Sequence, residues 1–123
     1  MDSPRKGQTL KSEVPPANIY ESAGQMTVAI PLPGTHAETI EVVLAKDRLR
    51  VHAEARYPQV QQHYLQREWH VGTFQRELRL PRSVHAGGAK ALLSHGVLTV
   101  SLHEGDWTGP AEVHLPVAEI AGH

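Results

Sequence analysis

Histidine is the residue type in this sequence that could most readily bind a metal ion or transfer protons, and the chain contains nine of them. No two stand at the His-x-His or His-Glu-x-x-His spacing that brings two imidazoles onto one metal ion. They are scattered over predicted strands and turns, at His36, His52, His63, His70, His85, His95, His103, His114 and His123. We therefore expect surface imidazoles, no metal site, and only a weak dependence of assembly on pH.

A phosphate-binding loop is suggested superficially by Gly87-Gly88 before Lys90. The G-x-x-x-x-G-K-[ST] arrangement is absent, and the residues after Lys90 are too strand-like to supply a helix N-terminus for phosphate. We expect no nucleotide and no other cofactor.

A hydrolase triad can be assembled on paper from Ser83, His85 and Asp106. No nucleophile elbow or oxyanion loop accompanies these residues, and many other trios would look equally good. The sequence offers no positive support for an enzyme, so function through binding surfaces is expected.

The composition fits one domain with a modest core. The chain has 123 residues, a formal net charge of -1 and no cysteine, and its pI is about 6.7. This charge attracts neither nucleic acid nor an anionic membrane. The first ten residues lack the apolar core of a signal peptide, and the absence of cysteine suits a reducing compartment, so we expect a cytoplasmic protein.

Alternation of apolar and polar residues predicts β-strands along most of the chain. It is clearest in QMTVAIPL, TIEVVLA and RLRVHAEA, at residues 25–32, 39–45 and 48–55. Pro33-Gly34 ends the first run, and Lys46-Asp47 is short enough to join the other two as a hairpin. Helical periodicity of useful length is missing. The number and spacing of short strands predict an all-β sandwich.

Gly96 separates two apolar pieces in the stretch ALLSHGVLTVSLHEG. The first piece is too short for a helix, and in the second Leu98, Val100 and Leu102 share one face of a strand. Two short strands joined at a tight turn are therefore expected, with Gly96 supplying the positive φ that such a turn requires.

Both ends of the chain depart from the alternating pattern. Residues 1–18 carry three prolines among polar residues and predict a mobile arm, followed by a domain at residues 19–104. Residues 105–123 resemble the arm but contain the apolar patch VHLPV.

Arg76, in GTFQRELRLP, is an anomaly because alternation places it on the same face as Phe74, Leu78 and Leu80. A guanidinium directed toward a core or an interface needs a carboxylate or several carbonyl partners. The alternative is an exposed strand from which Arg76 extends its charged end to water.

Three segments together resemble the small heat shock proteins, the family built on the α-crystallin domain. ALLSHGVLTVSL is similar to the family's A-x-x-x-n-G-V-L-x-V signature, with His95 where Asn or Asp is usual. GTFQRELRLP is similar to its G-x-F-x-R-x-F-x-L-P strand, and IPLPGTHAETIEVVLAKDRLRVHAEA to its L-P-G-v, i-x-V and L-x-I-x-G-e sequence. Their order and spacing agree from about Ile19 to Leu102.

The resemblance implies an immunoglobulin-like antiparallel β-sandwich of about seven or eight strands with flexible termini. It implies an ATP-independent holdase, which binds partly unfolded proteins and prevents their aggregation. It also implies a homodimer of the bacterial type, in which the loop at residues 56–68 exchanges a strand with the neighbouring subunit. The residues expected at this interface are Tyr57, Val60, Tyr64, Glu68 and Arg76, the last with a Glu or Asp partner.

The patch VHLPV resembles the family's C-terminal I-x-I motif, whose two aliphatic side chains plug a groove of another dimer. Residues i and i+2 of an extended segment point to one side, so Leu115 and Val117 would enter adjacent pockets; Val113 and Leu115 give an overlapping register. The expected lining positions are Val42, Leu44, Lys90 and Leu92. The alternative is that VHLPV packs on its own domain or is disordered.

The arm departs from the family pattern, because its eighteen or so residues contain no Phe or Trp. Either the arm is shortened or the protein stays near a dimer. The runner-up function is a co-chaperone of the CS-domain type, which docks on a folded chaperone. The VHLPV tail and the F-x-R strand favour the holdase, and the absence of an acidic disordered tail counts against the co-chaperone.

Overall fold

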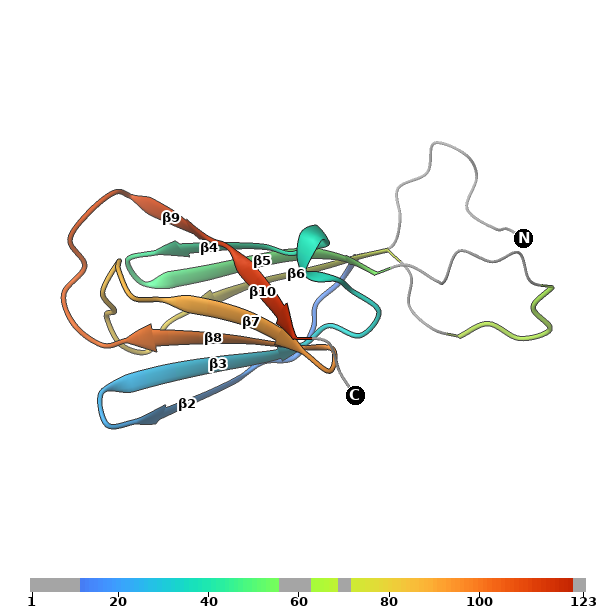
Figure 1. The fold of residues 1–123 in the computed structure, drawn as a ribbon, viewed down its shortest axis with the longest axis horizontal. Coiled ribbons are helices and arrows are strands. Elements are labelled where there is room, and N and C mark those ends of the chain that lie inside the picture. Colours follow the sequence, from blue (N-terminus) through green and yellow to red (C-terminus); the bar gives the residue numbers. More distant parts are fainter. Residues whose placement is uncertain (1–11, 56–62, 69–71, 121–123) are drawn as a thin grey trace.

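The computed structural model describes residues 12–55, 63–68 and 72–120. Two facing β-sheets of five strands each make up the described fold (Figure 1). Across the first sheet the strands are, in order, β1 (Ser12–Glu13), β6 (Gly72–Arg79), β5 (Arg48–Ala55), β4 (Glu41–Ala45) and β9 (Glu112–Leu115). Across the second they are β10 (Val117–Ile120), β7 (Lys90–Ser94), β8 (Val97–His103), β3 (Gln25–Pro31) and β2 (Asn18–Ser22). A single 3-10 turn, η1 (Ala37–Thr39), precedes β4.

Alternating side chains fill the space between the two sheets, as the sequence predicts. In the inner strands β3 and β8 every second residue is buried; these residues are Met26, Val28, Ile30, Leu98, Val100 and Leu102. A slip of one residue in either strand would turn this whole set toward solvent, so core burial sets the register. The prediction of an all-β sandwich is confirmed.

Two predicted hairpins are present. Lys46-Asp47 joins β4 to β5, and His95-Gly96 joins β7 to β8. His95 and Gly96 have φ values of +54° and +76°, and positive φ at both central residues is the geometry whose twist suits a two-residue hairpin turn. A Cβ atom on Gly96 would lie 3.7 Å from the Cα of Pro33, an ordinary contact. Glycine is therefore favoured by backbone conformation and not by lack of space.

The ends of the chain contribute strands that the sequence did not predict. Strands β2 to β8 form the body, and β9 adds an antiparallel eighth strand. The two others, β1 and β10, pair in parallel with β6 and β7. Parallel pairing needs a long connection, and both end segments reach their sheet edge from a remote part of the chain. Residues 12–13, 112–115 and 117–120 therefore form strands.

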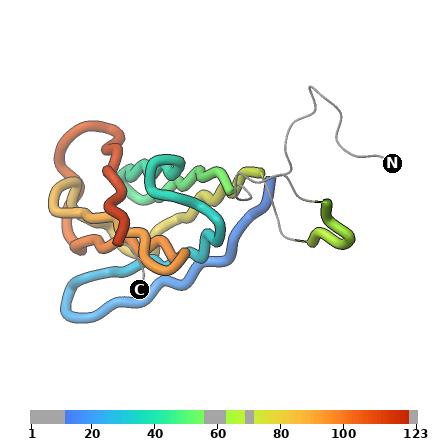
Figure 2. Tube along the Cα trace, turned by 45° about the vertical axis from the view of Figure 1, so that its right-hand side comes forward, coloured from blue at the N-terminus to red at the C-terminus, as the bar shows by residue number. Residues whose placement is uncertain are grey.

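Residues 63–68 stand away from the sandwich in both views of the chain (Figures 1 and 2). All six are exposed, and Leu65 is 92% exposed. Tyr64 and Glu68, which the sequence placed at a dimer interface, belong to this segment. Tyr57 and Val60, predicted for the same interface, lie outside the described residues.

Candidate functional site: a groove closed by the tail

The end of the chain crosses from one sheet to the other. β9 runs antiparallel to β4, and β10 runs parallel to β7 (Figure 1). Pro116 stands between β9 and β10, where the backbone leaves one hydrogen-bonded ladder for the next. Proline fits this position because it has no N–H to offer either ladder. Residues 112–120, called the tail segment below, thus cover an edge of each sheet.

Beneath the tail segment lie the edges of β4 and β7 with their aliphatic side chains, which are together called the edge groove below. Leu115 is opposite Val42 and Val113 is opposite Leu44 in the antiparallel register. Leu115 is 7% exposed, and both β4 residues are fully buried. Val113 and Val117 are half-buried and pack against the core. The structure therefore brings the three predicted plug residues onto the groove of their own chain.

On β7 the buried side chains differ from the predicted lining. The sequence indicated Lys90 and Leu92, but Lys90 is exposed and Leu92 is half-buried. The residues that face the core are Ala91 and Leu93, and Val117 pairs with Ala91. Alternation shows which residues of a strand share a face, but not which face is buried. Both faces of β7 carry an aliphatic residue, so the sequence pattern did not identify the buried face.

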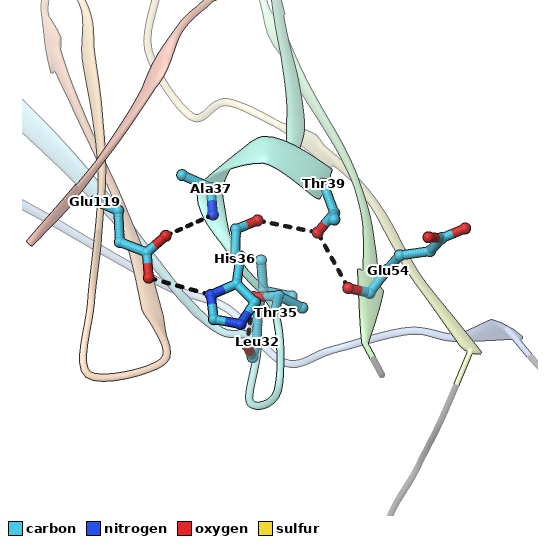
Figure 3. Close-up of polar contacts among 7 residues, drawn as sticks. All are labelled: Leu32, Thr35, His36, Ala37, Thr39, Glu54 and Glu119. Atoms are coloured by element: carbon cyan, nitrogen blue, oxygen red, sulfur yellow. Dashed lines mark hydrogen bonds and ion pairs between the residues drawn. The ribbon is translucent and has the colours of Figure 1, made fainter. Parts of the chain in front are cut away.

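A carboxylate fastens the far end of the tail segment (Figure 3). Oε1 of Glu119 accepts a hydrogen bond from the backbone N–H of Ala37 at 2.9 Å, and Oε2 lies 3.4 Å from Nδ1 of His36. The Ala37 hydrogen bond, with a smaller contribution from His36, lowers the pKa of Glu119 against the opposing effect of burial. Sequence reasoning missed this contact, because no local signal at Glu119 points to a partner 82 positions away.

Arg76 is half-buried, as its place on an apolar face suggests, and Nη1 donates to the backbone carbonyl of Pro15 at 2.8 Å. The predicted acidic partner is not seen among the residues that the structure describes. A carbonyl takes its place because the segment after β1 runs beside β6, where Ser12 pairs with Thr73. Arg76 thus ties the N-terminal segment to the first sheet.

A second polar cluster lies beside the outer strand β2. Nε and Nη2 of Arg82 each donate to a carboxylate oxygen of Glu21 at 3.0 Å. Oε2 of Glu104 lies 3.9 Å from Nε of Arg82, is buried, and has no hydrogen-bond partner among the described residues. Hydrogen bonding with Glu21, followed by burial, raises the pKa of Glu104, whereas the hydrogen bond from Arg82 lowers the pKa of Glu21. Two carboxyl groups therefore compete for one guanidinium.

Within the described ranges, no three His, Asp or Glu side chains are grouped so that they could hold a metal ion. In the triad considered above, Ser83, His85 and Asp106, Nδ1 of His85 lies 3.1 Å from the backbone carbonyl oxygen of Asp106. No helix in the described part of the chain is both long and apolar enough to span a membrane.

Comparisons with known proteins agree with this geometry. The family model described as "Hsp20/alpha crystallin family" matches residues 18–113. A small heat-shock protein from Xylella fastidiosa, whose structure is solved, is 33% identical, with 78% of this chain and 90% of that chain covered and a TM-score of 0.65. Heat shock protein 16.0 from Schizosaccharomyces pombe is 23% identical, with 79% and 92% covered and a TM-score of 0.69, and this likeness shows the fold alone.

Among curated proteins, Small heat shock protein C2 of Rickettsia felis is 24% identical over 101 residues. The match covers 80% of this chain and 66% of the relative, so the chain spans just under two thirds of that protein's length. Because the family model matches most of the chain, the protein belongs to the Hsp20/alpha crystallin family, the small heat shock proteins. Membership implies a chaperone role within a class of proteins that are not enzymes.

Proposed function

We propose that this protein is an ATP-independent holdase, which binds partly unfolded proteins and keeps them from aggregating. The observation that carries the proposal is the edge groove, where two sheet edges and buried aliphatic side chains are covered by a terminal strand pair. A terminal segment can leave its place without unfolding the strands beneath it, in contrast to an inner strand such as β8.

Release of the tail segment would uncover the edges of β4 and β7 together with Val42 and Leu44. Unpaired N–H and C=O groups beside aliphatic pockets accept extended apolar segments by strand addition. An unfolding protein presents such segments, and they offer the same chemistry as the tail segment itself. Capture is then a competition between similar strands and needs no nucleotide.

The tail segment is expected to bind the edge groove weakly enough to detach and rebind. Burying two aliphatic side chains contributes roughly 3 to 6 kcal/mol before the ordering of the segment is subtracted. Only Leu115 is fully buried, while Val117 is half-buried, which puts the contribution in the lower part of that range. The same segment could occupy the groove of a second copy, and several such weak contacts would stabilise an assembly by multivalency.

We also propose a homodimer through the loop at residues 56–68, as the family resemblance implied. The exposed position of Tyr64 and Glu68, away from the sandwich, supports a role for this loop in contact with another subunit. β2 is an outer strand that pairs with β3 alone in the described sheet, so its other edge can accept a strand. Arg76 is proposed to stabilise this arrangement, and the lack of cysteine supports a cytoplasmic location.

Light scattering of a heat-labile test protein, without nucleotide, tests the holdase proposal. We expect aggregation to be suppressed when the two proteins are present at near-equal molar amounts. Full protection at trace amounts, or a requirement for ATP, would reject the proposal.

A loosened tail segment tests whether the edge groove is the capture site. The double variant Leu115→Ala with Val117→Ala should suppress aggregation at a lower molar ratio than the unaltered chain. Ile120→Ala is the matched control, because Ile120 belongs to the same strand but is 51% exposed. Equal behaviour of all three proteins would remove the groove from the proposal.

A further inference from the structure

The contact between Glu119 and the loop before β4 reaches beyond the aliphatic part of the edge groove. Val117 and Glu119 are two residues apart in β10, so both side chains point to the same side of the strand. Val117 packs against the core, and Glu119 turns toward η1, as Figure 3 shows. The Glu119 carboxylate thus follows Val117 in the row of tail side chains that point toward the edge groove.

Each carboxylate oxygen meets a different group. Oε1 accepts the N–H of Ala37 at 2.9 Å, and Oε2 lies 3.4 Å from the ring nitrogen of His36. The backbone N–H donates at every pH, and a hydrogen bond to a charged acceptor is stronger than one between neutral groups. The Glu119 side chain is 37% exposed, and that of His36 is 70% exposed, so an incoming carboxylate can reach both partners from solvent.

The loop that offers these groups is held in shape by contacts that do not involve the tail segment. The buried hydroxyl of Thr35 donates to the carbonyl of Leu32 at 2.7 Å. The hydroxyl of Thr39 lies 3.0 Å from the carbonyl of His36 and 3.1 Å from that of Glu54, and it donates to one of them at a time. Such preorganisation lowers the entropy lost when a partner binds.

We propose that His36 and the backbone N–H of Ala37 form an anchor that selects extended segments with a carboxylate two residues after the last aliphatic residue. The edge groove then recognises Leu-Pro-Val, one further residue and then an acidic residue, and the occupant is the tail segment, whether of this chain or of a second copy. This inference rests on the proposed function, in which the tail segment leaves the groove and is exchanged.

Fluorescence anisotropy with synthetic peptides and the full-length chain tests the anchor. The probe is a labelled peptide with the sequence of residues 111–120, compared with peptides carrying Glu119→Gln or Glu112→Gln. Glu112 is the matched control, because it forms an exposed ion pair with Arg50 at 3.6 Å and lies outside the anchor. We expect Glu119→Gln to weaken binding about fivefold to tenfold, and Glu112→Gln to change it less than twofold.

Equal affinity of the Glu119→Gln peptide and the unaltered peptide would overturn the anchor while leaving the exchangeable tail intact. If no peptide binds, hydrogen exchange of the full-length variants Glu119→Ala and Glu112→Ala decides. Faster hydrogen exchange of the β10 amides in Glu119→Ala alone would support the anchor within one chain and reject the transfer of tails between chains. Equal hydrogen exchange in both variants would overturn the anchor.

Discussion

Leu115 in the tail segment lies directly opposite Val42 in β4, and both side chains are buried, at 7% and 1% exposure. The two residues are joined through the backbone ladder of β9 and β4 and through the apolar contact beneath it. This pairing makes β9 part of the sandwich, at the edge of its sheet, where it can detach without unfolding the inner strands.

Leu115→Ala should loosen the tail segment and leave the body folded. The loss of the side chain is expected to cost about 2 kcal/mol in the free energy of tail opening, the low end for buried Leu-to-Ala changes, since an edge site can partly collapse. Amides on the β4 edge should then exchange with solvent roughly 30-fold faster.

Hydrogen exchange followed by mass spectrometry checks this prediction. Val113→Ala is the control on the same strand, because Val113 is only half-buried and should have a smaller effect. Unchanged exchange of Glu41–Ala45 in Leu115→Ala would show that Leu115 does not hold the tail in solution.

The body of the sandwich was predictable from the sequence because burial on one face leaves a clear period of two. β3 and β5 show it, with buried residues at every second position. β2 was not predicted, because an outer strand needs little apolar pattern, and Ile19 is its one residue that is even half-buried. The VHLPV patch revealed an extended apolar segment, and the family resemblance indicated the two strands beside it, which are β4 and β7 in the structure.

The remaining features depend on contacts between remote positions. Whether Ala91 and Leu93 or Lys90 and Leu92 face inward follows from the neighbours of β7, which a local pattern does not contain. The Glu119 anchor joins residues that are 82 positions apart in the sequence. A carboxylate near the chain end is common, and nothing in its own surroundings in the sequence distinguishes this one.

Gly96→Ala should destabilise the whole domain by about 1 kcal/mol, since an L-residue resists a φ of +76°. The nearby Pro33 leaves room for the methyl group, so a larger loss is not expected. Chemical denaturation checks the change in the free energy of unfolding. His95→Gly is the counterpart, since His95 also has a positive φ, and it should be neutral or stabilising; a similar loss in both variants would contradict the conformational explanation.

Arg76→Met should detach the N-terminal segment from β6. Methionine keeps much of the side-chain volume but removes the hydrogen bond to the carbonyl of Pro15, which is worth about 1 kcal/mol at a half-buried site. Cleavage after Glu13 by a glutamate-specific protease should become several-fold faster. Gln75→Met, at an exposed position of the same strand, is the control, and equal cleavage of both variants would show that Arg76 does not tie down the segment.

Glu104→Gln should stabilise the fold at pH 7.5, and the gain should shrink as the pH falls toward 4.5. The pKa of Glu104 is raised from 4.5, chiefly by its hydrogen bond with Glu21. A carboxyl group with a raised pKa stabilises the fold while it is protonated, and this stabilisation is lost as the pH rises through the raised value. The amide of a glutamine can donate a hydrogen bond to Glu21 at every pH. The variant therefore keeps at pH 7.5 the stabilising hydrogen bond that the ionised Glu104 carboxylate can no longer donate.

Thermal unfolding at several pH values measures this gain, which should be a few degrees at most because the partners Arg82 and Glu21 are exposed. Glu21→Gln provides the opposite case, because the pKa of Glu21 is lowered, chiefly by Arg82. Its stabilisation is present above pH 4.5 and is lost as the pH falls, so Glu21→Gln should lower the melting temperature at pH 7.5. If the two variants shift the melting temperature in the same direction at pH 7.5, Glu21 and Glu104 do not share Arg82 in the way that the structure indicates.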